Sequence, residues 1–541
     1  MSVWPGRIAR AGSGLLVLGA VVAVTGASYL APVPGDVVVD RDSLPVPPGP
    51  TTLVCPGPVV LPDSRDDVDP EFNPAPVDSV DAVALVVGGE PGAAPLDVWP
   101  LDGLAAAPVL RADPAGSRLA TGELTGPLVA RAEPSEGVAA RVAGTVVSTV
   151  STGDLRGTTA AACQHPGSEH WLVGGGTELG TTSLLVVQNP GATPAEVGLD
   201  IWGPAGKVEL GGAGRYVVPS GGELSLRLSA FAPELARAVV RVSSTGGQVA
   251  AFMQVSKLDG FTPGGSDLVV AGHAPAERQV VGTLVVPASE IDGPGAGQLR
   301  LLAPGAAAAA DLEAPGAGDE AEATPATERV SAGVTLLGPE GPVTLPGAEE
   351  LDLVVDEVMD VDLGGLPAGA YAVVVDAERP IVAGARIERV GSPAEPGDAA
   401  PVELARTPAT LLGGDAVLAV PAGLSATAVV AAVPVSFDEV AGVMSGVLRV
   451  YDESGAQILV EDVSVPVGSA LVVPLPTGTA AVDLVPTAAD DAVTGGGRLT
   501  WGLLAEATGP DGAFVSTLSV PVRGAAVTEV AVRGAQRLPL D

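Results

Sequence analysis

Apolar and polar residues alternate along short segments of this chain, and each segment runs into turn residues. Segment 199–206 reads Leu-Asp-Ile-Trp-Gly-Pro-Ala-Gly, and segment 336–341 reads Leu-Leu-Gly-Pro-Glu-Gly. A period of two is typical of a strand with one buried face. Proline at the second turn position and glycine at the fourth suit a type I turn. The pattern predicts antiparallel hairpins, and the same unit recurs at 96–103 and 448–455.

A second feature, two strand-like segments around a short polar turn, follows the first three units at 128–140, 238–251 and 372–384. In the fourth copy we assign it to 499–515, displaced by an insertion at 490–497. A period of roughly 115 to 135 residues with many short strands favours β-sandwich domains and is too long for a solenoid repeat or a propeller blade.

Composition breaks then divide the chain. The fold class that we predict is all-β, with tandem antiparallel β-sandwich (immunoglobulin-like) domains after one N-terminal transmembrane or signal helix. The expected segments are a proline-rich spacer at 36–50, sandwich units at 51–160, 161–262, 279–390 and 407–541, a joining segment at 262–278, and a linker at 391–406. We expect a disordered insertion at 306–322 in the third unit, with a short surface helix as the alternative.

The N-terminal region carries the signal for location. Residues 11–35 contain no charged residue, arginines precede them within 1–10, and aspartates follow at 36–42. Such a segment is long enough to cross a bilayer, and this charge balance places the N-terminus in the cytoplasm and the rest outside. The short apolar core at 15–24 and the small residues at 25–27 also suit a cleaved signal peptide. We expect a single-pass membrane protein, with secretion after cleavage as the alternative.

Composition supports the β prediction and restricts the partners. The chain has 72 glycines and 51 prolines, which suits many short strands joined by turns. Its formal net charge is −37, whereas nucleic acids and anionic lipids need a basic surface. We therefore expect no nucleic-acid partner. The expected partners are the cytoplasmic membrane, through the N-terminal helix, and envelope polysaccharide or envelope proteins.

The chain has two cysteines, Cys55 and Cys163, and both fall in the exported part. An oxidising compartment favours a disulfide between them, and two free thiols are the alternative. A catalytic cysteine is a poor third option, because no nucleophile motif accompanies the nearby His165 and His170.

Acidic residues form the one weak metal candidate. Asp66, Asp67, Asp69 and Glu71 crowd a loop whose oxygen-rich composition suits calcium, but the EF-hand spacing is missing and a solvated acidic loop is the alternative. A second acidic cluster at 352–362 alternates with apolar residues, as the solvent face of strands does.

No motif predicts catalysis. The glycine run at 171–177 resembles a phosphate-binding loop only weakly, because position 179 is leucine and the run leads into a strand, so we interpret it as a structural hairpin or bulge. Neither HExxH nor GxSxG nor a P-loop occurs. We expect no catalytic residue, no cofactor, no nucleotide and no enzymatic activity.

Three tryptophans are candidates for ligand contact. Trp99 and Trp202 come just before turns and Trp171 opens a strand, positions that are compatible with aromatic platforms for sugars. Burial in small valine and alanine cores is the alternative.

Blocks of sequence also carry a family resemblance. Trp-Leu-Val-Gly-Gly-Gly-Thr at 171–177, segments 184–191, 202–206 and 246–251, and the later blocks 303–305 and 380–385 together resemble the actinobacterial family of exported proteins called domain of unknown function 5719. The resemblance implies a β-rich, exported envelope protein of a high-GC Gram-positive cell, and it implies no catalytic residues.

The function that we expect is a non-catalytic, membrane-anchored extracytoplasmic envelope protein with a structural or partner-binding role. A carbohydrate-binding or wall-polymer-binding module is the alternative, and a secreted hydrolase is the third possibility.

Overall fold

The computed structural model describes residues 43–61, 79–88, 95–113, 119–291, 293, 295–305, 328–393, 395–413, 416–438, 440–487, 496–509, 512–521 and 529–531. These residues form strands throughout, with three short 3₁₀ helices, η1 (Leu101–Gly103), η2 (Gly211–Gly214) and η3 (Leu228–Ala230). The all-β prediction is confirmed. Among the residues described, no helix is both long enough and apolar enough to span a bilayer. The expected N-terminal helix at 11–35 and the insertion at 306–322 lie outside those residues.

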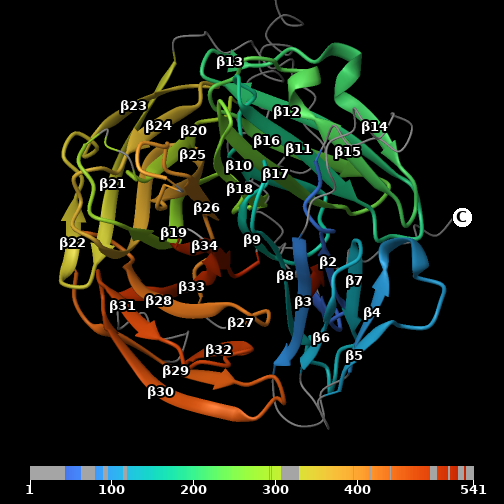
Figure 1. Cartoon of the computed structure of the whole chain (residues 1–541). Coiled ribbons are helices and arrows are strands. Elements are labelled where there is room, and N and C mark those ends of the chain that lie inside the picture. The colour runs from blue at the N-terminus through green and yellow to red at the C-terminus, as the bar shows by residue number, and fades with distance from the viewer. Residues whose placement is uncertain are drawn as a thin grey trace, which may run out of the picture. The chain divides into compact units, whose positions relative to one another are not determined.

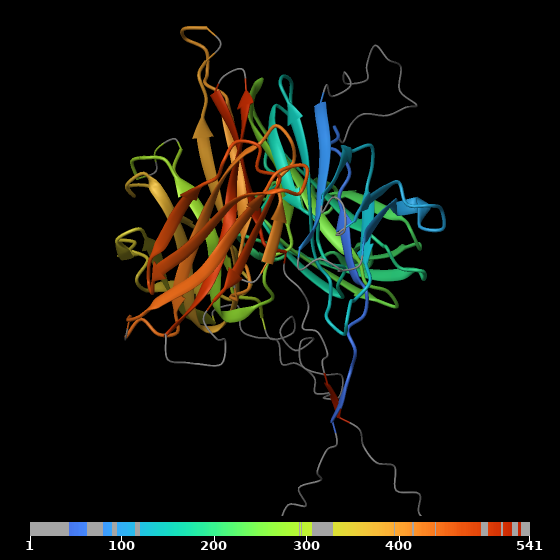
Figure 2. The same ribbon diagram turned by 90° about the horizontal axis from the view of Figure 1, so that it is seen from below.

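The chain divides into two compact units, one containing 1–47 with 527–541 and the other containing 48–526. In the first unit, β1 (Ser43–Pro45) pairs antiparallel with β35 (Glu529–Ala531). Figure 2 shows these two short strands side by side, β1 in blue and β35 in red. Two expectations are corrected: the spacer at 36–50 contains strand β1, and β35, which falls in the range expected for the fourth sandwich unit, pairs with β1.

The larger unit contains four sandwiches, which we name sandwiches 1 to 4 in chain order. Sandwich 1 pairs the sheets β2-β7-β4-β5 and β6-β3-β8-β9. Its strands are β2 (Thr51–Cys55), β3 (Ser79–Gly88), β4 (Leu96–Pro100), β5 (Leu110–Ala112), β6 (Leu119–Glu123), β7 (Leu128–Ala132), β8 (Arg141–Val150) and β9 (Gly157–Ala162).

Sandwich 2 pairs the sheet β10-β16-β12-β13, to which β14 is added beside β12, with the sheet β15-β11-β17-β18. Its strands are β10 (Glu169–Val173), β11 (Thr181–Gln188), β12 (Ala195–Gly203), β13 (Gly206–Lys207), β14 (Arg215–Val218), β15 (Glu223–Arg227), β16 (Val239–Thr245), β17 (Ala250–Asp259) and β18 (Thr262–Val270).

Sandwich 3 differs because one strand, β25, runs through both of its sheets. The first part of β25 pairs with β19 and β21, and the second part pairs with β20 and β26. The strands are β19 (Ala276–Val286), β20 (Gln298–Leu302), β21 (Arg329–Gly338), β22 (Gly341–Thr344), β23 (Leu351–Val354), β24 (Met359–Asp362), β25 (Gly369–Val390) and β26 (Val402–Pro408).

Sandwich 4 pairs the sheets β27-β32-β29-β30 and β31-β28-β33-β34. Its strands are β27 (Ala416–Ala419), β28 (Ser425–Pro434), β29 (Val443–Tyr451), β30 (Gln457–Pro466), β31 (Ala470–Pro474), β32 (Ala481–Pro486), β33 (Gly497–Gly509) and β34 (Gly512–Ser519). All four sandwiches share one topology, with strand order first-sixth-third-fourth in one sheet and fifth-second-seventh-eighth in the other. In this count β13 with β14, and β22 with β23, each stand for one fourth strand, and the two parts of β25 are the sixth and seventh strands.

The repeated alternating units of the sequence occupy the same place in every sandwich. Each is the third strand with the turn that leads to the fourth, and two of the turns end at Gly206 and Gly341 with φ of 111° and 124°. Glycine adopts this positive φ without a Cβ penalty. Between the sheets, alternate residues face the core, as in β21, where Val330, Val334 and Leu336 belong to one buried cluster.

The second repeated feature is not a hairpin, which corrects our interpretation. Its two segments are the sixth and seventh strands, which lie in opposite sheets. In sandwich 4 these strands are β32 and β33, whereas segment 499–515 contains β33 and β34, the next pair along the chain. A turn that crosses between sheets has the same composition as one that closes a hairpin, so sequence alone did not separate them.

Two expected boundaries are also corrected. Segment 262–278 contains β18, which pairs with β17 and completes sandwich 2. Segment 391–406 leads into β26, which pairs with β25 from Val390 opposite Val402 to Gly384 opposite Pro408. The last strand of each of these sandwiches therefore lies within, or overlaps, what composition marks as a linker.

The eighth strands of the four sandwiches contact one another in a closed ring: β9 contacts β18 and β34, and β26 contacts the same two strands. The labels of these strands gather in the middle of the larger unit in Figure 1. Polar groups join them, since the Ala160 N–H donates to Ser516 Oγ at 3.1 Å and Thr407 Oγ1 donates to Thr517 Oγ1 at 3.0 Å. These strands are sheet edges, and the ring covers them.

Candidate functional site

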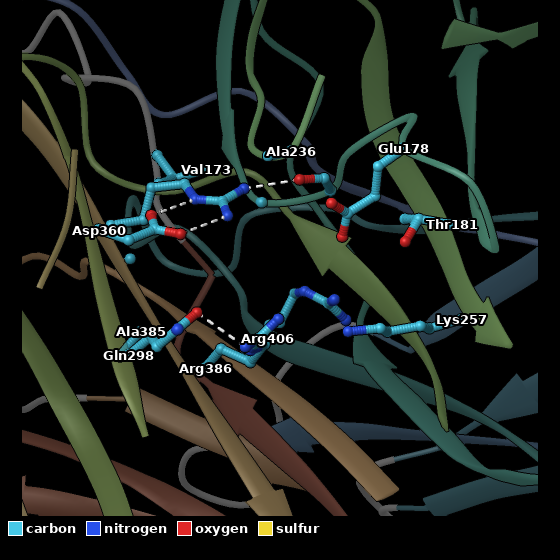
Figure 3. Close-up of a pocket in the computed structure, with 14 residues that line it drawn as sticks. Val173, Glu178, Thr181, Ala236, Lys257, Gln298, Asp360, Ala385, Arg386 and Arg406 are labelled. Atoms are coloured by element: carbon cyan, nitrogen blue, oxygen red, sulfur yellow. Dashed lines mark hydrogen bonds and ion pairs between the residues drawn. The ribbon is translucent and has the colours of Figure 1, made fainter. Parts of the chain in front are cut away.

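A pocket of about 40 Å³ lies between sandwiches 2 and 3. A water molecule needs roughly 10 to 15 Å³ on this measure, so the pocket suits a few waters or one small polar group. Four cationic side chains line it in a protein of net charge −37. These are Lys257, Arg300, Arg386 and Arg406. Figure 3 shows Lys257, Arg386 and Arg406 around one space together with the carboxylates Glu178 and Asp360.

The glycine run after β10 forms one wall. A Cβ on Gly174 would lie 2.9 Å from Val269 Cγ2 and 3.2 Å from Arg406 Cδ, so glycine lets the arginine approach the backbone. Gly175 has φ of 81°, and its carbonyl accepts a hydrogen bond from Arg300 Nη1 at 2.6 Å. The run therefore shapes the pocket, and because it joins β10 to β11, which lie in opposite sheets, it is not the hairpin that we expected.

Arg300 on β20 is held in place on several sides. Its Nε and Nη2 donate to the two carboxylate oxygens of Asp360 at 2.8 and 2.9 Å, in a bidentate pair. Its Nη1 also donates to the carbonyls of Gly175 and Ala238, at 2.6 and 3.2 Å. Asp360 belongs to the acidic cluster at 352–362 that we interpreted as solvent-facing, and its carboxylate is instead half-buried in this pair.

Arg386 and Arg406 lie directly opposite each other on the antiparallel strands β25 and β26. Arg386 Nη2 donates to Gln298 Oε1 at 2.7 Å and lies 2.8 Å from Glu388 Oε1. Arg406 Nη1 lies 3.8 Å from Asp267 Oδ2, which is beyond hydrogen-bonding distance. Like charges placed directly opposite on neighbouring strands repel each other, so this pair needs compensation.

Burial shifts the titration of this group of residues. It lowers the pKa of the Arg406 guanidinium to about 10, and the nearby positive charges of Arg386 and Arg300 act in the same direction. Burial also raises the pKa of the Asp267 carboxyl to about 7, although that carboxylate accepts the Arg406 backbone N–H at 2.6 Å. Near neutral pH, Asp267 therefore offsets the arginine charge only in part.

The lining of the pocket is rich in hydrogen-bond donors. Its lining supplies four cations, two carboxylates, the Thr181 hydroxyl and the Gln298 amide, and within the described residues it includes no histidine, cysteine or serine. A nucleophile with a general base is the arrangement that covalent catalysis requires. Within the described residues the lining lacks the histidine-based version of that arrangement, and it offers several hydrogen-bond donors to oxygen acceptors.

A second, larger hollow of about 490 Å³ lies on the sheet that contains β12 and β16. Its lining is mostly polar and includes Glu196, Asp200, Lys207, Arg215 and Ser243. Lys207 Nζ lies 2.7 Å from Asp200 Oδ1, so the floor carries an ion pair. We name this hollow the sandwich-2 groove.

The tryptophan candidates take two different places. Trp171 and Trp202 are 1 % and 0 % exposed, and their rings stack with centroids 5.2 Å apart. Trp202 Nε1 donates to Asp356 Oδ1 of sandwich 3 at 2.8 Å. Burial, the alternative that the sequence left open, therefore holds for these two, and neither offers a platform to a ligand. Trp99 is half-buried, and its Nε1 donates to the Ala106 carbonyl at 3.1 Å.

The disulfide prediction is confirmed. Cys55 on β2 is bonded to Cys163, which directly follows β9, so the bond links the first and last strands of sandwich 1. His170, near Cys163 in sequence, is buried, with Nε2 2.7 Å from the Val249 carbonyl oxygen, and burial lowers its pKa.

The calcium candidates Asp66, Asp67, Asp69 and Glu71 lie outside the residues that the structure describes. Within the described ranges, no group of three or more histidine, cysteine, aspartate or glutamate side chains is placed to hold a metal ion.

No curated protein matches the chain. Two solved structures align with it at low scores. One, titled "Crystal Structure of Thermotoga maritima 1070", is 12% identical and covers 25% of this chain and 93% of its own, with a TM-score of 0.17. The other, "Biofilm associated protein - BSP domain", is 9% identical and covers 88% of this chain and 96% of its own, with a TM-score of 0.13. Neither score supports a structural comparison.

A sequence family does match. The model of the Family of unknown function (DUF5719) covers residues 119–476, more than half of the chain, and this range contains Gly174 and the three pocket arginines. The chain therefore belongs to the Family of unknown function (DUF5719).

Proposed function

We propose that this protein is a non-catalytic component of the extracytoplasmic cell envelope, anchored by residues 11–35, which binds an envelope partner through the pocket between sandwiches 2 and 3. The observation that carries the proposal is the lining of that pocket, which concentrates hydrogen-bond donors and, within the described residues, contains no histidine, cysteine or serine. The uncharged segment 11–35 and the Cys55–Cys163 disulfide support the extracytoplasmic location, because disulfides persist in oxidising compartments.

The rigidity of the pocket supports a binding role. Arg300 is fixed by hydrogen bonds to Asp360, Gly175 and Ala238, so its wall is ordered before any partner arrives. Preorganised donors reduce the entropy lost on binding. The ring of eighth strands supports a structural role, since it joins the four sandwiches that would present the pocket to a partner.

In-cell photocrosslinking tests this proposal. Leu179, beside the pocket residue Glu178, is fully exposed, so a photoreactive amino acid at position 179 samples what approaches the pocket. Val460 on sandwich 4 is also exposed and is the matched control position. We expect an extracytoplasmic adduct from position 179 and none from position 460. Equal labelling from both positions, or labelling only by cytoplasmic proteins, would contradict the proposal.

Wall-polymer binding is the second candidate, and the size and polarity of the sandwich-2 groove favour it. A pull-down with purified envelope polysaccharide tests it. Arg215→Ala and Ser243→Ala should weaken retention if the groove binds the polymer, and Trp99→Ala tests the remaining tryptophan candidate. Retention unchanged in all three variants would remove this candidate.

Hydrolysis is the third possibility, which the proposed function excludes. A broad panel of hydrolase substrates tests this possibility. Hydrolytic activity that copurifies with the chain, and that is lost in Glu403→Gln or Asp267→Asn, would contradict the non-catalytic role. These two buried carboxyls are the natural targets because their raised pKa values, about 8 and about 7, are what an acid–base group needs.

A further inference from the structure

We infer that the pocket between sandwiches 2 and 3 binds an oxyanion, a carboxylate or phosphate-type group, through Arg386 and Arg406 with Lys257 on the facing wall. The inference rests on the proposed function and deepens it by naming the chemical class of the group that the pocket receives. Figure 3 shows the three cationic side chains converging on the pocket from different strands.

The first argument is the register of β25 and β26. Because Arg386 and Arg406 are direct cross-strand partners, their charges repel each other unless something negative lies between or beside them. Arg386 has Glu388 at 2.8 Å, whereas Arg406 lies farther from the Asp267 carboxylate, at 3.8 Å, and Glu388 also offsets part of the Arg406 charge. An oxyanion that contacts both guanidinium groups would offset the repulsion.

The second argument is the donors that these arginines leave unused. Arg386 Nε and Arg406 Nη1 are buried and have no hydrogen-bond acceptor in the part of the chain that the structure describes. The Arg406 side chain is only 8% exposed and lines the pocket. Buried donors are almost always paired in folded proteins, and guanidinium groups bind carboxylate and phosphate oxygens in matched geometry. The two atoms therefore indicate an oxygen-rich ligand.

The third argument is the role of the other lining charges. Arg300 is engaged by Asp360 and two carbonyls, so it forms the wall and is not a free donor. Lys257 extends from β17 toward Arg406 as a single charge on a flexible stem (Figure 3). Glu178 lines the same pocket and opposes an anion. Glu178 therefore lowers the affinity of the pocket for an anion. Glu178→Gln should strengthen anion binding, whereas replacing a cationic residue should weaken it.

The size of the pocket restricts the ligand further. At about 40 Å³ it accepts one small group and not a sugar ring or a nucleotide. The ligand is therefore an acidic group carried by a larger molecule or a free small anion. The experiment below distinguishes a carboxylate group from a phosphate group by testing separate probes.

Isothermal titration of the full chain tests the inference, with inorganic phosphate, sulfate and acetate as separate probes at constant ionic strength. We expect saturable binding of at least one probe. Arg406→Gln and Lys257→Gln should each weaken it at least tenfold, while Glu178→Gln should strengthen it severalfold. Arg111→Gln on sandwich 1, where the arginine is 56% exposed, is the matched charge control and should change nothing. Preference for phosphate or for acetate assigns the source.

Absence of binding by all three probes at tens of millimolar, or binding that is equal in Arg406→Gln, Lys257→Gln and the Arg111→Gln control, would overturn the inference. Lys257 is partly exposed, so its variant tests the site even if Arg406→Gln fails to fold. The proposed function fails separately: anion binding without a crosslink at position 179 contradicts the envelope role only, and a crosslink without anion binding contradicts the oxyanion site only.

Discussion

Glu403 Oε1 on β26 accepts the backbone N–H of Thr158 on β9 at 2.7 Å, which joins the eighth strands of sandwiches 3 and 1. The glutamate is 3 % exposed, and its Oε2 lies 3.7 Å from Arg156 Nη1. Gly157 permits the approach, because a Cβ there would lie 2.7 Å from Glu403 Oε1. A carboxyl group therefore sits inside the ring of eighth strands, and stability should depend on its protonation.

The first prediction concerns pH. Burial raises the pKa of Glu403 to about 8 and that of Asp267 to about 7, above their ordinary values of 4.5 and 3.8. At a pH between the ordinary pKa and the raised pKa of each carboxyl group, the unfolded chain has released a proton that the folded chain still holds. The free energy of unfolding therefore falls as pH rises. Urea unfolding at pH 7 to 9 should show this decline, because the lowered pKa of His170 acts in the opposite direction only below its ordinary value of 6.5, and Glu403→Gln should flatten the decline.

Glu453→Gln at an exposed position of sandwich 4 is the control for this prediction and should leave the slope unchanged. Stability that rises from pH 7 to 8, or an unaltered slope in Glu403→Gln, would refute the assignment.

The second prediction concerns the disulfide. The Cys55–Cys163 bond closes a sequence separation of 108 residues, so removing it enlarges the unfolded ensemble. The double variant Cys55→Ala with Cys163→Ala should lose about 2 to 5 kcal/mol of unfolding free energy. Urea denaturation measures this, and wild type with reductant should match the variant. A wild-type midpoint that reductant does not move would argue against the bond.

The third prediction concerns the glycine wall. Gly174→Ala places a Cβ against Val269 and Arg406, so the packing must shift and the free energy of unfolding should fall by about 1 to 3 kcal/mol. Gly212→Ala in the same sandwich meets no atom within 4 Å and is the control. Equal midpoints for the two variants in thermal denaturation would show that the close approach is not needed.

The fourth prediction concerns Trp202. Trp202→Phe removes the N–H that donates to Asp356 Oδ1 across sandwiches 2 and 3, although Gly305 N still donates to the same oxygen at 2.9 Å. We expect a loss of about 1 to 2 kcal/mol in urea denaturation. Trp99→Phe, whose hydrogen bond is exposed to solvent, should cost less. A larger loss from Trp99→Phe would reverse the roles given to the two rings.

The sequence predicts the part of the fold that is local. The turn at 203–206 determines a hairpin because proline, glycine and the alternating strand before it lie within a few residues. The sixth and seventh strands could not be assigned to sheets, because a crossing between sheets depends on packing across the sandwich. In sandwich 3 the sixth and seventh strands form one continuous strand, β25. No turn signal in the sequence marks the point where it passes from one sheet to the other.

The candidate site was predictable only in its glycine run. Arg300, Arg386 and Arg406 each stand in a strand that mixes apolar and polar residues, where a charged side chain is normally a solvent-facing residue. Their convergence depends on the register of β25 with β26 and on the packing of sandwich 2 against sandwich 3. The same packing buries Trp171 and Trp202. The alternation of apolar and polar residues along their strands would place both side chains on the outer face of the sheet.

Export is the central claim of the account, and mass spectrometry of the mature protein tests it most directly. Membrane, culture and cytosolic fractions would be alkylated without reduction, and the N-terminus and the cysteine peptides mapped. The account predicts a membrane-bound chain that retains residues 11–35 and yields a linked Cys55–Cys163 peptide. A soluble cytosolic chain with both cysteines alkylated would contradict it.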